Sequence, residues 1–284
     1  MRLGTARPER GGAALAVAVS GDRDQILEPL ADSDRRGLLG LIAAGPQALA
    51  EAYAGRSAAT EPLRLVAPLR PPKIVAIGLN YLDHIRETNL PRPEVPLVFT
   101  KFTTSVIGPG EPIPIDATLT ERVDWEVELG AVIGRRLRRV SATDALAGVC
   151  GYTVANDVSA RDLQFSDGQW VRAKSLDGFC PLGPVIVTAD EIADPQRLAL
   201  ATRVNGEIVQ DSNTAEMLFG VAELIEFCSR SFTLEPGDLI LTGTPWGCGE
   251  FMEPQRSLHP GDEVEVAIER IGALANPVVA DEAA

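Results

Sequence analysis

Three acidic residues in the sequence could bind a metal ion together. Glu126 and Glu128 lie two apart in the segment 124–129, and residues two apart in a strand point to the same face. Their carboxylates repel each other unless protons, basic side chains or a cation neutralise them. Alone, the pair also fits a solvated strand face. A third acid, Asp157, follows the apolar strand expected at 152–155, at a strand end where functional groups tend to lie.

The predicted ligand set contains only oxygen, because no histidine or cysteine lies beside these acids. Such a set suits Mg²⁺ or Mn²⁺, with Ca²⁺ also possible, and disfavours zinc and copper. Three protein ligands would leave about three octahedral positions open. A keto acid or an enolised diketone could occupy two of them and water the third.

Cationic side chains that could face this site follow in the sequence. Arg161 and Gln164 lie one helical turn apart, on one face of a short expected helix. They could bind a carboxylate or carbonyl of a substrate, although surface salt bridging explains them equally well. Lys174 and Arg172 follow before a stiff segment at 179–184.

His84 is one of two histidines in the chain, and Glu87 lies three residues after it. On a helix these side chains can meet. A carboxylate beside an imidazole raises its basicity and fixes its tautomer, which would make His84 a general base. A lone surface histidine is the alternative. We interpret His259, in a proline-flanked turn, as structural.

Composition excludes several classes of protein. The net charge of -14 over 284 residues argues against a nucleic-acid partner, which needs clustered Lys and Arg. No run of about 18 apolar residues indicates a membrane span. The four cysteines are not spaced as a zinc site and are expected to be reduced thiols. We therefore expect a cytoplasmic protein.

The elements that position these residues divide into two regions. Residues 1–66 form an expected small N-terminal α/β domain, with a strand at 13–19 and helices at 33–44 and 47–54. We expect Ser33 to cap the first helix. A proline cluster at 62–72 marks the boundary, and residues 67–284 form the catalytic domain.

The catalytic domain is predicted to be α+β and rich in strands, with mixed sheets rolled around a centre. Asn205-Gly206 predicts a type I′ hairpin. The expected strands are 74–77, 97–101, 125–133, 150–156, 184–187, 198–204, 239–242 and 263–268. The expected helices are one capped by Asn80 that runs to Glu87, and those at 142–147, 162–165 and 215–229.

These residues together resemble the fumarylacetoacetate hydrolase family over most of residues 62–277. Each motif is weak alone, but their order and spacing are specific. The motifs are Gly78-Leu79-Asn80-Tyr81 with His84, Asp124-x-Glu126-x-Glu128-Leu129, Asn156-Asp157-Val158-Ser159-Ala160-Arg161-Asp162-Leu163-Gln164, Lys174 with Pro181-Leu182-Gly183-Pro184, Val204-Asn205-Gly206, and Leu234-Glu235-Pro236-Gly237-Asp238 followed by Thr242-Gly243-Thr244-Pro245.

The resemblance implies a mixed β-roll with a smaller N-terminal domain and a homodimer. It also implies roles for individual residues: the metal ligands Glu126, Glu128 and Asp157, the substrate pocket of Lys174, Arg161, Gln164 and Thr244, and a lid that carries His84 and Glu87. Three positions depart from the pattern. Leu79 stands where acylpyruvase-like members often carry Arg, and Trp246 and Cys248 replace the usual small loop residues.

The leading functional hypothesis is metal-assisted hydrolysis of a C–C bond in an acylpyruvate-type β-diketo acid. His84 and Glu87 would activate water, and Lys174 would stabilise the leaving enolate. The same site could instead decarboxylate or isomerise diacids such as oxaloacetate or 2-hydroxyhepta-2,4-diene-1,7-dioate. A non-catalytic binding domain stabilised by a metal is the alternative from another class.

Overall fold

The computed structural model describes residues 1–20, 25–30 and 33–281. The strands are β1 (Arg2–Pro8), β2 (Leu15–Val19), β3 (Ile26–Pro29), β4 (Leu63–Val66), β5 (Ile74–Gly78), β6 (Leu97–Lys101), β7 (Val106–Ile107), β8 (Ile113–Ile115), β9 (Val123–Asp124), β10 (Val127–Ile133), β11 (Val149–Asn156), β12 (Ser159–Ala160), β13 (Cys180–Thr188), β14 (Ala199–Val204), β15 (Glu207–Asn213), β16 (Leu239–Leu241), β17 (Glu263–Ile268) and β18 (Gly272–Ala280). The α-helices are α1 (Ser33–Ala44), α2 (Pro46–Tyr53), α3 (Leu82–Thr88), α4 (Ala142–Ala145), α5 (Arg161–Asp167), α6 (Val171–Lys174) and α7 (Val221–Ser231).

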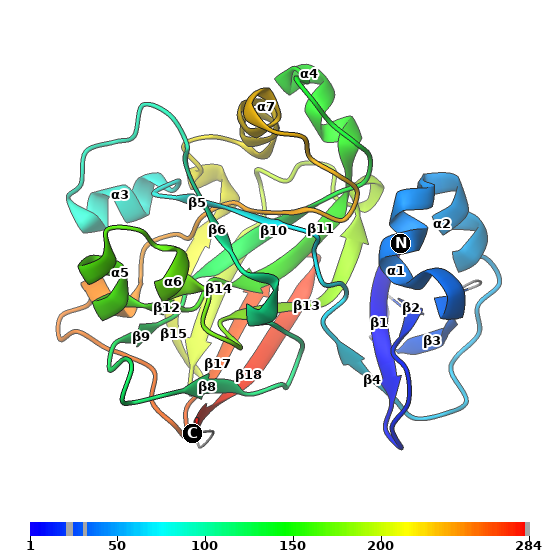
Figure 1. Ribbon diagram of the computed structural model, residues 1–284, viewed down its shortest axis with the longest axis horizontal. Coiled ribbons are helices and arrows are strands. Elements are labelled where there is room, and N and C mark those ends of the chain that lie inside the picture. Colours follow the sequence, from blue (N-terminus) through cyan, green and yellow to red (C-terminus); the bar gives the residue numbers. More distant parts are fainter. Residues whose placement is uncertain (21–24, 31–32, 282–284) are drawn as a thin grey trace.

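Two larger sheets build the molecule (Figure 1). In the described residues, the first has eleven strands in the path β3-β2-β1-β13-β11-β10-β16-β5-β6, with β4 and β7 added at its side. The second has the order β15-β14-β17-β18-β8. Parallel and antiparallel pairs occur in both sheets. The α+β, strand-rich class with mixed sheets is therefore confirmed.

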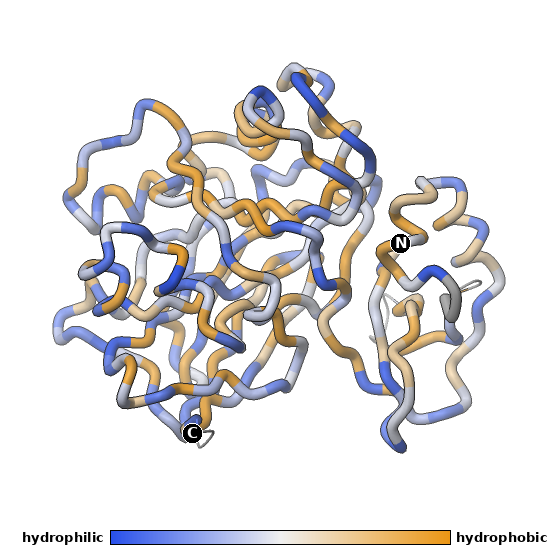
Figure 2. The backbone as a smooth tube through the Cα atoms, viewed as in Figure 1, coloured by the Kyte–Doolittle hydropathy of each residue, from blue (hydrophilic) through white to orange (hydrophobic). Residues whose placement is uncertain are grey.

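Strand β10 lies in the middle of the first sheet and is buried along its whole length. Leu129, Ala131 and Ile133 pack in one hydrophobic cluster, whereas Val132 packs in a second cluster. Because side chains alternate along a strand, the two clusters contact opposite faces of this strand. Figure 2 shows hydrophobic residues along the central strands and hydrophilic residues mainly in the outer loops.

The N-terminal unit shares the first sheet with the rest of the chain. Strand β1 pairs with β2 and β4 inside the unit, and its Arg2 and Leu3 pair with Val187 and Ile186 of β13. Helix α1 packs on β2 and on α2. The expected boundary at residue 66 coincides with the end of β4, while the division into domains at that residue stays a prediction.

Several predicted elements have different bounds in the structure. The helix expected at 215–229 begins only at Val221, after a separate 3-10 turn at Thr214–Glu216. The reason is a long-range contact: the Asn80 amide accepts from the Phe219 N–H at 3.0 Å and donates to the Phe219 carbonyl at 3.0 Å, and so keeps the backbone there non-helical. Asn80 is consequently not the cap of α3, whose N-cap is Tyr81.

The helices of the N-terminal unit lie close to their expected positions. Helix α1 begins at Ser33, the residue expected to cap it, and is kinked at Gly37. The residue before Ser33 lies outside the described residues.

The expected hairpin is present, because Asn205 and Gly206 have φ of 52° and 82° between paired strands β14 and β15.

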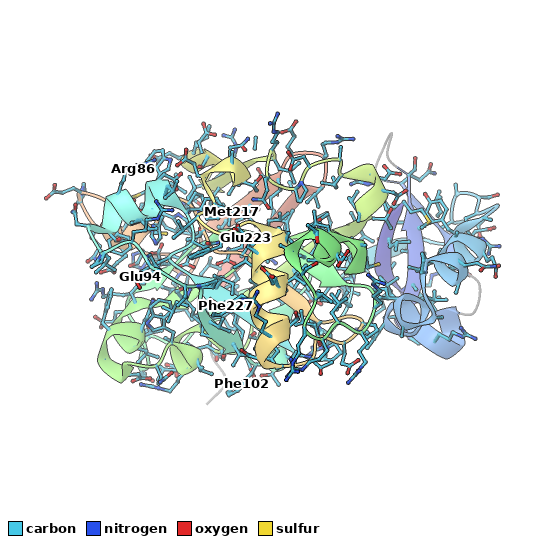
Figure 3. All side chains as sticks on the ribbon, turned by 90° about the horizontal axis from the view of Figure 1, so that it is seen from above. Arg86, Glu94, Phe102, Met217, Glu223 and Phe227 are labelled. Atoms are coloured by element: carbon cyan, nitrogen blue, oxygen red, sulfur yellow. The ribbon has the colours of Figure 1, made fainter. Side chains whose placement is uncertain are left out.

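The helices outside the N-terminal unit are short and lie around the sheets. Seen from above, α7 carries Glu223 and Phe227, and α3 carries Arg86 on the side away from the N-terminal unit (Figure 3). None of the helices in the described part of the chain is long and apolar enough to cross a membrane.

Candidate active site

Two adjacent core strands bring the three predicted metal ligands together. Glu126 joins β9 to β10, Glu128 is the second residue of β10, and Asp157 follows β11 directly. The Asp157 N–H donates to the Glu126 carbonyl at 2.8 Å, and the Glu126 N–H donates to Asn156 Oδ1 at 3.0 Å. Carboxylate oxygens of the three acids lie within 4.8 Å of one another, and all three residues are buried. The structure thus forms the cluster that the alternation and the strand end predict.

Three cationic side chains surround this triad. Lys174 Nζ lies 2.8 Å from both Glu126 Oε2 and Asp157 Oδ2. Lys101 Nζ donates to the other Asp157 oxygen at 2.5 Å, and both side chains are completely buried. Arg161 Nη1 lies 2.7 Å from Glu126 Oε1. Glu126 and Asp157 are therefore compensated by charged partners from the chain itself.

Glu128 forms no ion pair in the described residues, and the charge of Lys174 acts on it only from farther away. The Gly243 N–H donates to Glu128 Oε2 at 2.9 Å. Burial, followed by repulsion from Asp157 and Glu126, raises its pKa well above the usual value. A buried carboxylate that forms no ion pair and lies beside two further carboxylates is suited to bind a divalent cation with oxygen ligands.

Glycine is required where that hydrogen bond is made. Gly243 has a φ of +92°, which side-chain-bearing residues rarely adopt, and a Cβ there would lie 2.9 Å from the Asn80 Cβ. The turn after β16 thereby directs a backbone N–H to Glu128.

The pKa of Glu126 shows how strongly the cations act. Burial by itself would raise this pKa, but the charges of Lys174 and then Arg161 outweigh burial and lower it to about 2. The reverse holds for Lys174, where burial would lower the pKa and the charges of Asp157 and Glu126 raise it. Glu126 is therefore ionised across the physiological pH range.

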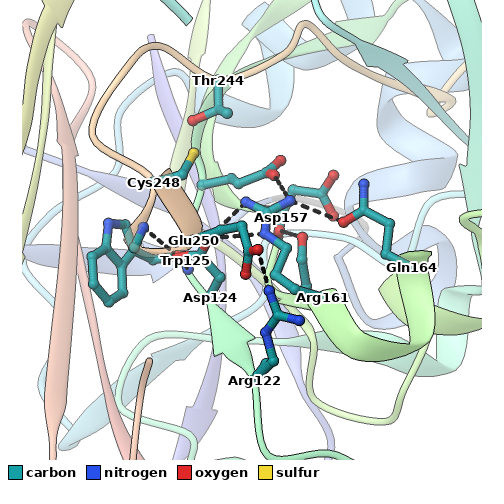
Figure 4. Close-up of polar contacts among 12 residues, drawn as sticks. Arg122, Asp124, Trp125, Asp157, Arg161, Gln164, Thr244, Cys248 and Glu250 are labelled. Carbon is teal, nitrogen blue, oxygen red and sulfur yellow. Dashed lines mark hydrogen bonds and ion pairs between the residues drawn. The ribbon is translucent and has the colours of Figure 1, made fainter. Parts of the chain in front are cut away.

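Arg161 is held by a second acid that the sequence left without a role. Its Nε donates to Asp124 Oδ2 at 2.8 Å, and its Nη1 donates to Gln164 Oε1 at 2.9 Å. Asp124 also accepts backbone N–H groups from Trp125, Gly249 and Glu250. Figure 4 shows these contacts below Thr244 and Cys248. Asp124 therefore links Arg161 to the loop after β16 through hydrogen bonds to both.

A cavity of about 90 Å³ opens onto the triad. Its polar lining includes Glu126, Glu128, Arg161, Gln164, Lys174, Thr244, Thr88 and His84, and its apolar lining includes Ile77, Leu79, Leu90, Phe99, Phe165, Trp170 and Phe251. Asp157 is not in this lining and lies behind it, between the two lysines. All the other predicted site residues except Glu87 line one small cavity.

The predicted dyad is formed on helix α3. His84 Nδ1 lies 2.8 Å from Glu87 Oε2, and Glu87 Oε1 accepts the Gly247 N–H at 2.8 Å. An ionised carboxylate can only accept hydrogen bonds, so Nδ1 carries a proton, and in the neutral imidazole Nε2 then keeps a free lone pair. The ring of Phe251 packs edge-on against His84, at 5.5 Å between centroids. Glu87 thus orients the imidazole that lines the cavity.

Lys101 and Asp124 are the main residues that the sequence did not identify. Lys101 ends an ordinary strand, and nothing local distinguishes it from a solvated lysine. Asp124 stands two residues before Glu126, so the same alternation that selected Glu126 and Glu128 could have selected it.

Comparisons with known proteins identify the family of the chain. Residues 73–279 match the family model described as fumarylacetoacetate (FAA) hydrolase C-terminal. The chain is 50% identical over 217 residues to the mitochondrial oxaloacetate tautomerase FAHD2A of Bos taurus, which covers 75% of this chain and 69% of that protein.

Solved structures extend the likeness to the whole chain. A fumarylacetoacetate hydrolase from Exiguobacterium antarcticum has a TM-score of 0.87 at 38% identity, with 99% of this chain and 100% of that chain covered. A 2-hydroxyhepta-2,4-diene-1,7-dioate isomerase from Mycobacterium marinum has a TM-score of 0.79 at 37% identity, with 100% of both chains covered. The chain therefore belongs to the fumarylacetoacetate hydrolase family of enzymes.

Proposed function

We propose that the chain catalyses keto–enol tautomerisation of a small 2-oxo diacid such as oxaloacetate, with Mg²⁺ or Mn²⁺ held by Glu126, Glu128 and Asp157. The observation that carries this proposal is the shared cavity, onto which both the acid cluster and His84 open. The relative from Bos taurus is named an oxaloacetate tautomerase, and the isomerase from Mycobacterium marinum also acts without loss of atoms, as its name states.

The size of the cavity supports a short substrate. Its volume of about 90 Å³ is well below the roughly 300–1,000 Å³ of sites for drug-sized ligands. A four-carbon diacid suits this space better than a long acylpyruvate. Among the polar side chains of the lining, Arg161, Gln164 and Thr244 can bind a carboxylate or carbonyl of such a molecule.

The metal fits the triad because Glu128 is buried without a cationic partner of its own in the described residues. When bound, Mg²⁺ or Mn²⁺ supplies Lewis-acid polarisation of the substrate carbonyl.

The protein's own groups move the proton. In the neutral imidazole with its proton on Nδ1, beside Glu87, His84 Nε2 takes a proton from the carbon between the two carbonyl groups. The C–H electron pair forms the C=C bond, the carbonyl electron pair moves onto oxygen, and His84 returns the proton to that oxygen. Lys174, which lines the same cavity, stabilises the negative charge that develops on the oxygen. The net reaction converts ketone to enol without loss of atoms.

Hydrolysis of a C–C bond in a small β-diketo acid is the second candidate. The dyad favours it, since the same His84 Nε2 could take a proton from water. The structural neighbour from Exiguobacterium antarcticum is named a hydrolase. Decarboxylation of oxaloacetate needs no water attack at all, so the products distinguish the three reactions.

The test follows loss of enol absorbance from freshly dissolved oxaloacetate, with Mg²⁺ and with chelator, and identifies the products by mass. We expect equal-mass product and a Mg²⁺-dependent rate, which Glu126→Gln lowers by about 10²-fold or more. The control Glu263→Gln changes an exposed glutamate of β17 and should keep the wild-type rate. Carbon dioxide or two carbon fragments as the main products would contradict the proposal. So would a Glu126→Gln protein that, in chelator, is as fast as the wild type in Mg²⁺.

A further inference from the structure

Cys248 lies beside the dyad and has no part in the proton transfer proposed above. Its Sγ, a carboxylate oxygen of Glu87 and a ring nitrogen of His84 all lie within 4.8 Å of one another. Cys248 and His84 are buried, and the Glu87 side chain is 15% exposed. Figure 4 places Cys248 next to Thr244, on the loop after β16. Three different donor groups therefore meet beside the cavity, which His84 lines.

These donors differ in kind from those of the acid triad. Thiolate, imidazole and carboxylate together form a ligand set that zinc binds in proteins, usually with four ligands in a tetrahedron. A thiolate selects softer cations over magnesium, whereas an all-oxygen set selects Mg²⁺ or Mn²⁺. Two neighbouring clusters in this protein thus differ in the cations that they prefer.

The backbone around the cluster already holds two of the donors in place. His84 and Glu87 lie one turn apart on α3, and Glu87 Oε1 is fixed by the N–H of Gly247, the residue before Cys248. The sulfur contacts the Pro245 carbonyl and Gln210 Nε2 only at 3.9 Å, so strong hydrogen bonds do not occupy it. The three groups lie close enough to share a cation once Glu87 gives up its hydrogen bond to His84 or to Gly247.

We propose that His84, Glu87 and Cys248 form an inhibitory site for a thiophilic divalent cation such as Zn²⁺, distinct from the Mg²⁺ or Mn²⁺ site of the acid triad. Binding replaces the S–H bond by a sulfur–metal bond and releases the thiol proton to solvent. Burial raises the pKa of Cys248, so the free protein holds the thiol protonated and the cation must displace that proton.

Inhibition follows because the cation takes the groups that the reaction uses. A His84 nitrogen bound to zinc, or a Glu87 oxygen withdrawn from the imidazole, can no longer support proton transfer. The inhibition rests on the proposed function. The binding of the cation is independent of that function, because it can be measured without any substrate.

Binding is tested with Co²⁺ as a spectroscopic substitute for zinc, added to the full-length protein in excess Mg²⁺ so that the acid triad stays occupied. We expect one Co²⁺ per chain and a thiolate-to-cobalt charge-transfer band. Cys248→Ala should lose this band, and Cys248→Ser should lose it too while keeping a side chain of similar size. Cys150→Ala is the matched control, because Cys150 is a free thiol outside the cluster and should keep the band.

Zn²⁺ inhibition is then measured in the same Mg²⁺ buffer. We expect Cys248→Ala and Cys248→Ser to keep the rate without zinc and to need at least about tenfold more Zn²⁺ for half inhibition, which is about 1.4 kcal/mol of binding. Equal inhibition of wild type and both variants would place zinc at the acid triad and overturn the proposal. A wild-type protein without the cobalt band, or a variant that keeps it, would also overturn it. If oxaloacetate is not turned over, the cobalt band still decides the site, so failure of the proposed function is seen separately.

Discussion

The acid triad and the His84–Glu87 dyad serve one cavity but are held in different ways. Glu128 lies in β10 and Asp157 directly follows β11, two core strands that pair over seven residues of β10, and buried lysines compensate the Asp157 charge. The dyad sits on a seven-residue helix, held to its surroundings by single hydrogen bonds such as that of Glu87 with Gly247. Charges that must stay close together lie beside paired core strands, whereas the group proposed to transfer the proton lies on a short helix, which we expect to be the more mobile of the two.

This difference predicts that loss of a buried charge partner of the triad lowers stability, whereas changes to the dyad lower turnover and leave stability unchanged. The largest expected effect on stability comes from Lys101→Met, which leaves Asp157 buried with one of its two cationic partners missing. Removing one partner of a buried ion pair typically costs about 3–5 kcal/mol in the free energy of unfolding. Urea unfolding measures this loss.

The matched control for Lys101→Met is Arg172→Met. Arg172 pairs with Asp167 on the surface, with 52% of its side chain exposed, and such pairs contribute about 0–1 kcal/mol. A Lys101→Met protein that unfolds within about 1 kcal/mol of wild type would show that the sheet does not depend on this charge.

His84→Asn should show the opposite behaviour. Loss of a general base lowers kcat by about 10²–10⁴-fold, while the urea midpoint and the affinity for Mg²⁺ stay close to wild type. His259→Asn is the control, since it changes the other histidine, which is exposed in a turn. If His84→Asn lost Mg²⁺ affinity together with kcat, the two regions would not act separately.

Gly78→Ala tests the cavity wall between the two regions. A Cβ at Gly78 would lie 2.3 Å from Trp170 Cζ3, and both residues line the cavity. Overpacking of this kind costs about 1–3 kcal/mol, so we expect KM to rise several-fold as Trp170 moves, with a smaller change in kcat.

A double variant that combines Gly78→Ala with Trp170→Leu lacks the indole ring that the new methyl group would contact. Gly78→Ala should therefore have little further effect on KM in that background. If Gly78→Ala raises KM equally in the wild type and in the Trp170→Leu protein, contact with Trp170 is not the cause of the rise.

The same comparison explains which parts of the site the sequence predicted. Alternation along one strand selected Glu126 and Glu128, and the i,i+3 spacing selected His84 and Glu87, because these relations are local. Lys101 contacts Asp157 from 56 positions away, and no local pattern indicates that its ammonium group is buried. Residues that act through the tertiary fold were therefore missed.

Strand prediction followed the same rule. β6 and β17 have the predicted bounds, because β17 alternates between polar and apolar residues and β6 begins with three apolar residues in a row. β18 was missed, since Asn276 and Pro277 lie within it and its stability comes from pairing with β17 and β8. The first turns expected for α7 are absent because Asn80, from a distant segment, binds the backbone of Phe219.

The smallest predicted effect concerns the attachment of α3. Ser212 Oγ of β15 donates to Asp83 Oδ2 at 2.5 Å, and loss of one such hydrogen bond costs about 0.5–1.5 kcal/mol. Ser212→Ala should therefore speed amide hydrogen exchange in α3 and lower kcat by less than about tenfold, with no change in exchange in β10. The control Ser231→Ala changes an exposed serine at the end of α7. If the variant and the wild type exchange amide hydrogens in α3 at the same rate, the other contacts of the helix are enough to hold the dyad in place. The dyad and the triad would then not differ in mobility.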